Sequence, residues 1–553
     1  MVERMIERWR RLGLKTTQTV GAAAFIISLS GIASRFLGFL RDRLLASQFG
    51  AGDTLDAYYA AFRLPDLFYS LIVLGALSAA FLPVFTELRT KEREKEAWTL
   101  ASDVLGLLVI TLGLLGLLGA VYASQVVTLI APGFSGEKRE LAISLSRIML
   151  LSPIFLAVSA VLSGVLMSFR RFIAYSLAPL FYNVGIIFGI LVLVPICGIS
   201  GLGWGVVVGA LLHMATQWPA LSGTGIRLRL SPLRSLRNPE VRRVVRLMLP
   251  RSLSMGVSQI GLLVMTIFAS LLASGSLAAF TFANNIQSVA LGLFGVAFSV
   301  AAFPALSAYA AQKQGKEFFA VLSDAARRIL FFVLPISALM IVFRAQFVRV
   351  ILGSGHFNWE DTIVTFNVLA WLSVSLFAQS LIPLFARAFF ALQNTKTPLY
   401  IALGAEVFHI ALLLFLRQSD FFSIEMLAAA FSSATIVNLL FLYLALKREA
   451  VYWDDARMFA PAMKIALAAV LAGLFAQVSK YVFALTTNEL DTFVEVFLQL
   501  FFGLSIGGSA YLALCVWLRV EELQVLKRFI WCRILRQPET LASAEDHPEK
   551  GEW

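Results

Sequence analysis

Residues 105–123 read LGLLVITLGLLGLLGAVYA, a run without a single charged side chain. A helix of about 20 apolar residues spans the ~30 Å hydrocarbon core of a bilayer. Lipid offers the backbone no hydrogen-bond partner, so a continuous apolar run of this length favours a helix over an open strand. It also lacks the polar–apolar alternation of a transmembrane β-barrel strand. The stretch therefore predicts a membrane-spanning helix.

The rest of the chain repeats this pattern. Of 553 residues, 59% are hydrophobic and 14% charged, whereas a soluble domain is typically about 45–50% apolar and 25% charged. The sequence therefore predicts an all-α polytopic membrane protein of about fourteen transmembrane helices. The expected helices cover 20–46, 55–87, 98–128, 141–168, 174–196, 201–221, 244–272, 276–310, 318–351, 362–391, 398–416, 424–446, 458–484 and 492–518.

Basic residues alternate from loop to loop along this series. The loops that follow the even-numbered helices carry several Lys and Arg residues. The opposite loops, such as ASQFGAGDT (46–54), CGISG (197–201) and LLASGSL (271–277), are nearly free of them. Cytoplasmic loops carry an excess of Lys and Arg, so both termini are expected on the cytoplasmic side of the inner membrane. The basic loops contain Arg89, Lys91, Arg93 and Lys95; Arg170 and Arg171; Arg227, Arg229, Arg234 and Arg237; Lys313 and Lys316; Lys396; and Lys447 and Arg448.

These loops also account for the net charge of +12, and no recognition helix or aromatic-basic platform for nucleic acid accompanies it. Three widely spaced cysteines and four dispersed histidines form no metal set. No GxxxxGK[ST] phosphate loop is present. The sequence thus favours a transporter without an ATPase motif of its own, with no cofactor, over an enzyme.

A weak internal repeat divides the chain. SAAFLPVFTEL (78–88) resembles VAAFPALSAYA (300–310), and SGVLMSFRRFIAYSLAP (163–179) parallels ARAFFALQNTKTPLYIA (386–402). Repeats of this kind are typical of transporters that bind substrate between two halves. The expected organisation is a cytoplasmic interfacial segment at 1–19, an N-lobe of six helices at 20–221, a basic cytoplasmic linker at 222–243, a C-lobe of six helices at 244–446, an appended helix pair at 447–519, and an amphipathic helix with a disordered cytoplasmic tail at 520–553.

Ionisable residues at membrane depth usually face an interior cavity. Arg35 and Arg41 lie in the first expected helix, within SRFLGFLRDRL (34–44). They either face a cavity or form internal salt bridges with Asp42 or Asp56. Both readings stay open on sequence alone.

The second expected helix begins LDAYYAAFRLPDLFYS (55–70). Pro65 removes a backbone hydrogen bond and should kink the helix. Arg63 and Asp66 flank the kink three residues apart, so Arg63 either pairs with Asp66 on one helix face or contacts substrate.

Further polar residues interrupt the apolar runs of the second half. Arg251 follows Pro250, Arg387 follows Pro383, and Asn284 and Asn285 lie in the eighth expected helix. These are candidate substrate contacts, although Arg251 could equally lie at the cytoplasmic interface. The excess of arginine suits an anionic, phosphate-bearing substrate, because the guanidinium fork matches phosphate oxygens.

Glu406 and His409 lie three residues apart in one expected helix, and Ser432 and Thr435 lie in the next. This group is either an ion or proton site or a network of hydrogen bonds between helices.

Eight short motifs, in this order and spacing, resemble those of the MurJ-type lipid II flippases, within the multidrug/oligosaccharidyl-lipid/polysaccharide exporter superfamily. They are SRFLGFLRD (34–42), FGAG…DAYYAAFRLPD (49–66), GALSAAFLP (75–83), APGF (131–134), VSQI…TIFASLLASGS (257–276), LGLFGVAFSVAAFPALS (291–307), GSGHF (353–357) and QNTKTP (393–398).

The resemblance implies a two-lobed flippase with a cationic central cavity. It would move an undecaprenyl-diphosphate-linked peptidoglycan precursor from the cytoplasmic to the outer leaflet by alternating access. The implied partners are this anionic lipid-linked substrate, membrane lipids and cell-wall synthesis proteins. Coupling to a monovalent cation gradient or to the membrane potential stays open. Arg35, Arg41 and Asp56 match polar positions on which the family relies.

The chain departs from the family at two expected arginines, which fall at Tyr69 and Asn285, and at a glutamate, which falls at Ser288. Arg63, Arg251 or Arg387 would then have to supply the charge, or the substrate differs. The alternatives are an exporter of another polyprenyl-diphosphate-linked oligosaccharide, a cation-coupled multidrug exporter and, from another class, a non-transporting scaffold for cell-wall assembly.

Overall fold

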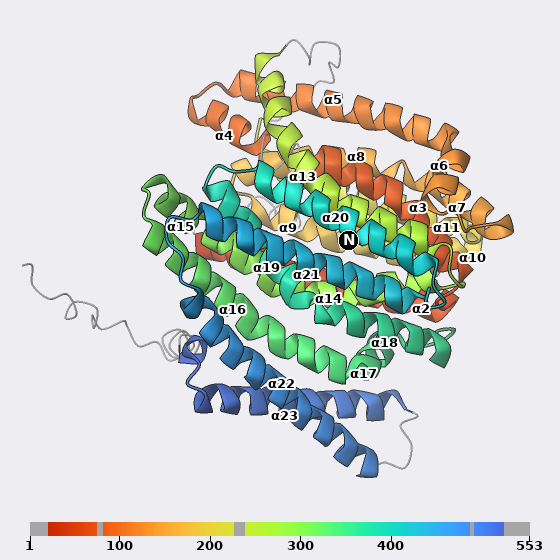
Figure 1. The fold of residues 1–553 in the computed structure, drawn as a ribbon. Helices are drawn as coiled ribbons and strands as arrows, with labels where there is room; N and C mark the ends of the chain where they lie inside the picture. Colours follow the sequence, from red (N-terminus) through yellow and green to blue (C-terminus); the bar gives the residue numbers. More distant parts are fainter. Residues whose placement is uncertain (1–19, 75–80, 226–237, 487–491, 525–553) are drawn as a thin grey trace, which may run out of the picture. The chain divides into compact units, whose positions relative to one another are not determined.

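The computed structural model describes residues 20–74, 81–225, 238–486 and 492–524. Within these ranges all regular structure is helical (Figure 1). The expected segment 1–19, most of the basic linker and nearly all of the tail after 520 lie outside the described residues.

Long apolar helices confirm the all-α polytopic fold. Among the described residues, nine helices are long and apolar enough to cross a membrane, and α18 with α19, bent by 43° between them, makes a tenth. Each of the fourteen expected segments contains helix, but the count of fourteen crossings stays a prediction.

The chain divides into two compact units, each made of three stretches of sequence. Unit 1 consists of residues 1–286, 348–372 and 399–434, and unit 2 consists of 287–347, 373–398 and 435–553. These bounds differ from those of the two expected lobes, which stay a prediction.

Unit 1 contains all the helices of the first half of the chain and parts of later ones. Its elements are α2 (Val20–Phe49), α3 (Asp53–Phe68), η1 (Tyr69–Leu74), α4 (Leu82–Thr90), α5 (Glu94–Val121), α6 (Ala123–Ile130), α7 (Gly136–Met149), α8 (Ser152–Ser168), α9 (Phe172–Phe188), η3 (Gly189–Leu193), α10 (Val194–Cys197), α11 (Ser200–Ala215), η4 (Trp218–Leu221), α13 (Pro239–Ala269) and most of α14 (Ser276–Ala290), α18 (Trp359–Val374) and α20 (Lys396–Arg417).

Unit 2 has its own apolar core, in which α16 and α23 both pack against α22 (Figure 1). The Tyr511 hydroxyl of α23 donates to the Phe331 carbonyl of α16 at 2.7 Å. The elements wholly in unit 2 are η5 (Leu291–Val296), α15 (Ala297–Ala311), α16 (Gly315–Val342), α19 (Leu376–Ala391), α22 (Asp455–Thr486) and α23 (Phe493–Trp517), whereas α17 (Arg344–Leu352) and α21 (Ile424–Glu449) are divided between the units.

Several expected spans are interrupted rather than continuous. The second expected helix passes from α3 through the internal Pro65 into η1, a π-helical segment of six residues. Two other expected spans contain the π-helical segments η3 and η5. Because π-helical turns are rare and often occur at functional sites, the segment around Pro65 and η1 in unit 1 is a candidate location for a functional site.

In unit 1, α9 and α11 approach each other through glycine. A Cβ added at Gly185 would lie 2.3 Å from the Gly209 Cα, so no larger residue fits without moving a helix. Small residues let helix backbones approach closely in membranes, where packing rather than burial from water drives helix association. The contact between Gly185 and Gly209 fixes the position of α9, the helix that carries Asn183, against α11.

Candidate functional site

A cavity of about 230 Å³ lies within unit 1, between α2, α3, α13 and α14. Aromatic, amide and charged side chains share its wall. The lining residues are Arg41, Leu45, Tyr58, Tyr59, Phe62, Arg63, Asp66, Leu262, Phe280, Thr281, Asn284 and Asn285.

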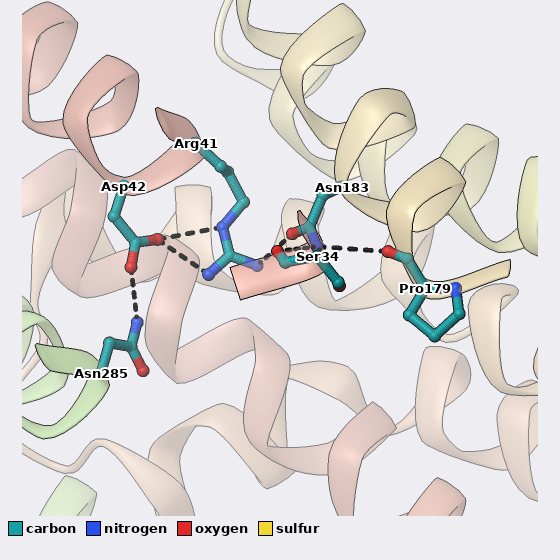
Figure 2. A network of polar contacts seen from close by, with 6 residues as sticks. All are labelled: Ser34, Arg41, Asp42, Pro179, Asn183 and Asn285. Atoms are coloured by element: carbon teal, nitrogen blue, oxygen red, sulfur yellow. Dashed lines mark hydrogen bonds and ion pairs between the residues drawn. The ribbon is translucent and has the colours of Figure 1, made fainter. Parts of the chain in front are cut away.

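Arg41 is held in place by one neighbour on its own helix, α2, and one on α9. Its Nε and Nη2 donate to Oδ1 of the buried Asp42 at 3.0 and 2.8 Å, and its Nη1 donates to Asn183 Oδ1 at 3.2 Å. Asn285 Nδ2 donates to the other Asp42 oxygen at 3.0 Å (Figure 2). Since Asp42 lies against it, Arg41 presents little uncompensated positive charge to the cavity.

Asn183 continues this network on α9. Its amide nitrogen lies within hydrogen-bond distance of the Ser34 carbonyl and hydroxyl of α2 and of the Pro179 carbonyl (Figure 2). The Asp42 and Asn183 contacts therefore tie α2 to α9 and α14 beside the cavity.

Arg63 has free donors in the cavity. Its Nε donates to Thr266 Oγ1 of α13 at 2.7 Å. Among the described residues, no hydrogen-bond partner reaches its Nη1 or Nη2, and neither atom is fully buried. A guanidinium held through Nε keeps its two terminal amino groups for a bidentate contact with an anion.

Asp66 lines the same cavity and is exposed within it. The sequence leaves open a pairing of Arg63 with Asp66. The structure does not form it, since within the described part of the chain no cationic nitrogen lies within 4 Å of this carboxylate. The cavity therefore holds one carboxylate beside its two arginines.

Comparison with known proteins identifies the family. The family model described as lipid II flippase MurJ matches residues 45–501. The chain belongs to the lipid II flippase MurJ family.

The family's members resemble the chain over most of its length. The lipid II flippase MurJ of Burkholderia cenocepacia is 30% identical over 466 residues, which cover 81% of this chain and 88% of that protein. The probable lipid II flippase MurJ of Buchnera aphidicola subsp. Baizongia pistaciae is 28% identical over 505 residues, 90% of this chain and 97% of that one.

Solved structures share the fold. A lipid II flippase MurJ in an inward closed conformation aligns with a TM-score of 0.72 at 24% identity, over 93% of this chain and 100% of that one. An inward-facing multidrug transporter of the MATE family aligns with a TM-score of 0.62 at 17% identity, over 75% and 95%. The chain is thus a multi-pass membrane protein of a lipid flippase transporter family.

The two positions at which the chain lacks an expected arginine lie at the cavity of unit 1 or against its apolar core. Asn285, where the resemblance expects an arginine, supplies a hydrogen bond to Asp42 instead of a charge. Tyr69, at the other expected arginine, begins η1 and packs against the apolar core of unit 1. Asn284 lines the cavity. Of the compensating arginines whose side chains the structure describes, Arg63 and Arg387, Arg63 lines this cavity with free donors.

The remaining expected substrate contacts are not among the cavity-lining residues. Arg35 is half-buried on α2. Arg387 lies in unit 2, where its Nη1 donates to the Pro383 carbonyl at 3.3 Å. The side chain of Arg251 lies outside the described residues. Their assignment as substrate contacts stays a prediction.

Asp56 joins three segments of chain and is only 2% exposed. Its carboxylate accepts the backbone N–H of Gly275 at 2.8 Å, the N–H of Ala278 at 2.9 Å and a bond from Lys138 Nζ at 2.7 Å. Lys138 also contacts the exposed Asp53 at 2.7 Å. We call Asp56, Lys138, Gly275 and Ala278 the Asp56 cluster; a substrate role for Asp56 stays a prediction.

The Asp56 cluster continues into neighbouring loops of unit 1. Gly355 has a positive φ of 59°. The backbone N–H of the next residue, His356, donates to the Ser47 carbonyl at 2.8 Å. The Ala51 N–H donates to Asp361 at 3.0 Å. The end of α2, the loop after it and the start of α3 are thus bonded to the α13–α14 turn with the start of α14, and to the α17–α18 turn with the start of α18.

Glu406 and His409 do come together on α20. His409 is buried, its Nδ1 lies 3.1 Å from Glu406 Oε1, and its Nε2 has no partner in the described part of the chain. The His409 ring lies edge-on to Phe431 at 5.9 Å. Ser432, however, donates to the Trp371 carbonyl at 2.8 Å, and Thr435 falls in unit 2. Across the described residues, no group of three or more His, Cys, Asp or Glu side chains could hold a metal ion.

Sequence reasoning missed Asn183, Thr266 and Lys138. The signal for Asn183 is visible in FYNVGIIF (181–188), where one amide interrupts an apolar run. Thr266 and Lys138 carry no comparable signal, because their importance comes from partners far away in the sequence.

Proposed function

We propose that this chain is a lipid II flippase of the bacterial inner membrane. It moves the undecaprenyl-diphosphate-linked peptidoglycan precursor from the cytoplasmic to the outer leaflet, with both of its own termini in the cytoplasm. The observation that carries the proposal is the family match over residues 45–501. A cavity with a free arginine fork in unit 1 supports it.

Arg63 is the residue on which we place the diphosphate. Its Nη1 and Nη2 can donate two parallel bonds to phosphate oxygens, the geometry that makes arginine a better phosphate ligand than lysine. Arg41 contributes less, because three of its five N–H donors are already used by Asp42 and Asn183. Arg63 thus takes over a role that the resemblance gives to arginines absent here.

Transport requires that the cavity open. Its volume of about 230 Å³ is below the ~300–1,000 Å³ of a pocket for a drug-sized molecule, and a disaccharide-peptide headgroup is larger still. The Asp56 cluster lies in loops that the charge pattern assigns to the outer side. We infer that its bonds hold the outer end closed in this state and break when the cavity opens outward.

Glu406 and His409 are the residues that we propose for coupling to a monovalent cation gradient. The His409 imidazole is buried, its partner Glu406 is partly exposed, and the His409 Nε2 has no hydrogen-bond partner in the described part of the chain. An ion or proton bound at this pair would give that nitrogen a partner. Loss of cation dependence in Glu406→Gln, with lipid II binding retained, would support this role.

The decisive experiment measures lipid II on the outer leaflet of vesicles containing the purified protein. Arg63→Ala should reduce the rate at least tenfold, because the lost bonds are charge-assisted. Arg63→Lys should recover part of it. Arg417→Ala is the matched control, since it removes an exposed arginine that does not line the cavity.

The alternatives give other results. Transport of a different polyprenyl-diphosphate-linked oligosaccharide but not lipid II would support the related exporter. Transport of cationic drugs would support the multidrug exporter. Wild-type growth of cells carrying Arg63→Ala would favour the cell-wall scaffold.

A further inference from the structure

The cavity of unit 1 is not simply cationic. Its lining contains Arg41, Arg63 and Asp66 as charged groups, and Arg41 is bonded to the buried Asp42. One free arginine fork and one free carboxylate therefore face the same space. A site evolved only to attract a diphosphate has no use for that carboxylate, since it repels phosphate.

Nothing in the described structure satisfies Asp66. Its carboxylate is exposed in the cavity and has no ion pair within 4 Å. The nearby Arg63 Nε is directed to Thr266 instead. Tyr59, which lines the same cavity and is 7% exposed, has a buried hydroxyl without a hydrogen-bond partner. Polar groups without a partner need an explanation, and a ligand that binds in this cavity would supply one.

The surroundings of Asp66 select the kind of ligand. A metal ion takes several oxygen or nitrogen ligands, and this part of the cavity offers a single carboxylate. Tyr58, Tyr59 and Phe62 instead supply aromatic rings on the same wall. A carboxylate beside aromatic rings is a setting that binds organic cations, which pair with the charge and pack against the ring faces.

Asp66 and Arg63 are neighbours on α3. Residues three apart in a helix have Cβ atoms about 5–6 Å from each other on one face. Two groups of opposite charge on the cargo could therefore be held at once, the phosphate by Arg63 and a cation by Asp66.

We propose that Asp66 is a specificity-determining residue that binds a primary ammonium group on the headgroup of the transported lipid. This rests on the proposed function, and it narrows the substrate class to lipid-linked headgroups that carry both a diphosphate and a free amine. A headgroup whose amine is acetylated loses the positive charge and should be a poor substrate.

The test compares two forms of lipid II in vesicles containing the full-length protein. One carries a free side-chain amine on its peptide, and in the other that amine is acetylated. The wild-type protein should prefer the free amine about tenfold, as expected for one hydrogen bond to a charged group. Asp66→Asn should remove the preference by slowing only the free-amine lipid, and Asp66→Glu should keep it.

Two results overturn the inference. One is equal transport of both lipids by the wild-type protein. The other is an equal slowing of both lipids in Asp66→Asn, which would show that Asp66 affects transport only through the position or charge of Arg63. Asp66→Asn is nearly isosteric, and its melting temperature in detergent reports whether it folds.

Binding of the same two lipids to the solubilised protein separates this inference from the proposed function. Binding that discriminates between them through Asp66, without transport, upholds the inference and rejects the flippase. Transport of both lipids without discrimination upholds the flippase and rejects the inference. Failure to bind either lipid rejects both.

Discussion

Replacing Asp56 by asparagine tests whether the Asp56 cluster holds one conformation closed. The carboxylate accepts three bonds, from Gly275, Ala278 and Lys138. The amide has one acceptor oxygen and no charge, so one backbone N–H loses its acceptor and Lys138 loses its ion pair with this side chain. Bonds to a charged group contribute roughly 1.5 kcal/mol or more each, which makes the loss about 3 kcal/mol. If the bonds exist only in the closed state, the equilibrium shifts toward opening by about 100-fold.

The assay is labelling of a cysteine placed at Ser276, which is 6% exposed in the closed cluster, by a membrane-impermeant maleimide. The background has its three native cysteines replaced by serine. Labelling should accelerate by a factor approaching 100 in Asp56→Asn. Asp53→Asn is the matched control, because Asp53 contacts the same Lys138 but its side chain is 59% exposed, so its pairing contributes less than about 1 kcal/mol. Equal labelling rates in the two variants would refute the reasoning.

Three further substitutions test a close contact between helices, a helix N-cap and a buried ion pair. Gly185→Ala should abolish folding, because its Cβ would lie 2.3 Å from the Gly209 Cα, whereas Gly113→Ala, with nothing within 4 Å, should not lower the yield of folded protein on size-exclusion chromatography. Asn238→Ala removes the N-cap of α13 and the amide bonded to the buried Asp103, so thermal unfolding should show a loss of about 2 kcal/mol. Arg327→Ala leaves the buried Glu522 of unit 2 without its cation, so the melting temperature should fall by an amount equivalent to about 3 kcal/mol, and Arg327→Lys should recover part of it.

The sequence was sufficient to predict the membrane fold, because hydrophobic length and the backbone's need for internal hydrogen bonds leave little choice. The sequence was less informative about where the helices bend or change to π-helical geometry. The bend between α18 and α19 and the π-helical η1, η3 and η5 lie in runs whose composition does not differ from that of a straight helix. Only Pro65 marked one of them in advance.

Residues of the candidate site were predictable from the sequence where a charged or amide side chain interrupts an apolar segment, because such side chains are costly in lipid. Arg41, Arg63, Asn284 and Asn285 were recognised for that reason, and all four line the cavity. Pairing was not predictable, since Arg63 binds a threonine about two hundred positions away rather than the aspartate three positions away. Spacing within a helix says which residues can meet, but only packing between helices decides which do.

The π-helical segment η1 directly follows the turn that carries Arg63 and Asp66. A π-helical turn contains one residue more than the α-helix around it, so it behaves as a dislocation that can migrate along the helix. Moving it past a side chain turns that side chain by about 100° around the helix axis, the rotation per residue of an α-helix. Such a shift would turn the arginine fork and the carboxylate out of the cavity together, because both side chains lie on the same turn of α3.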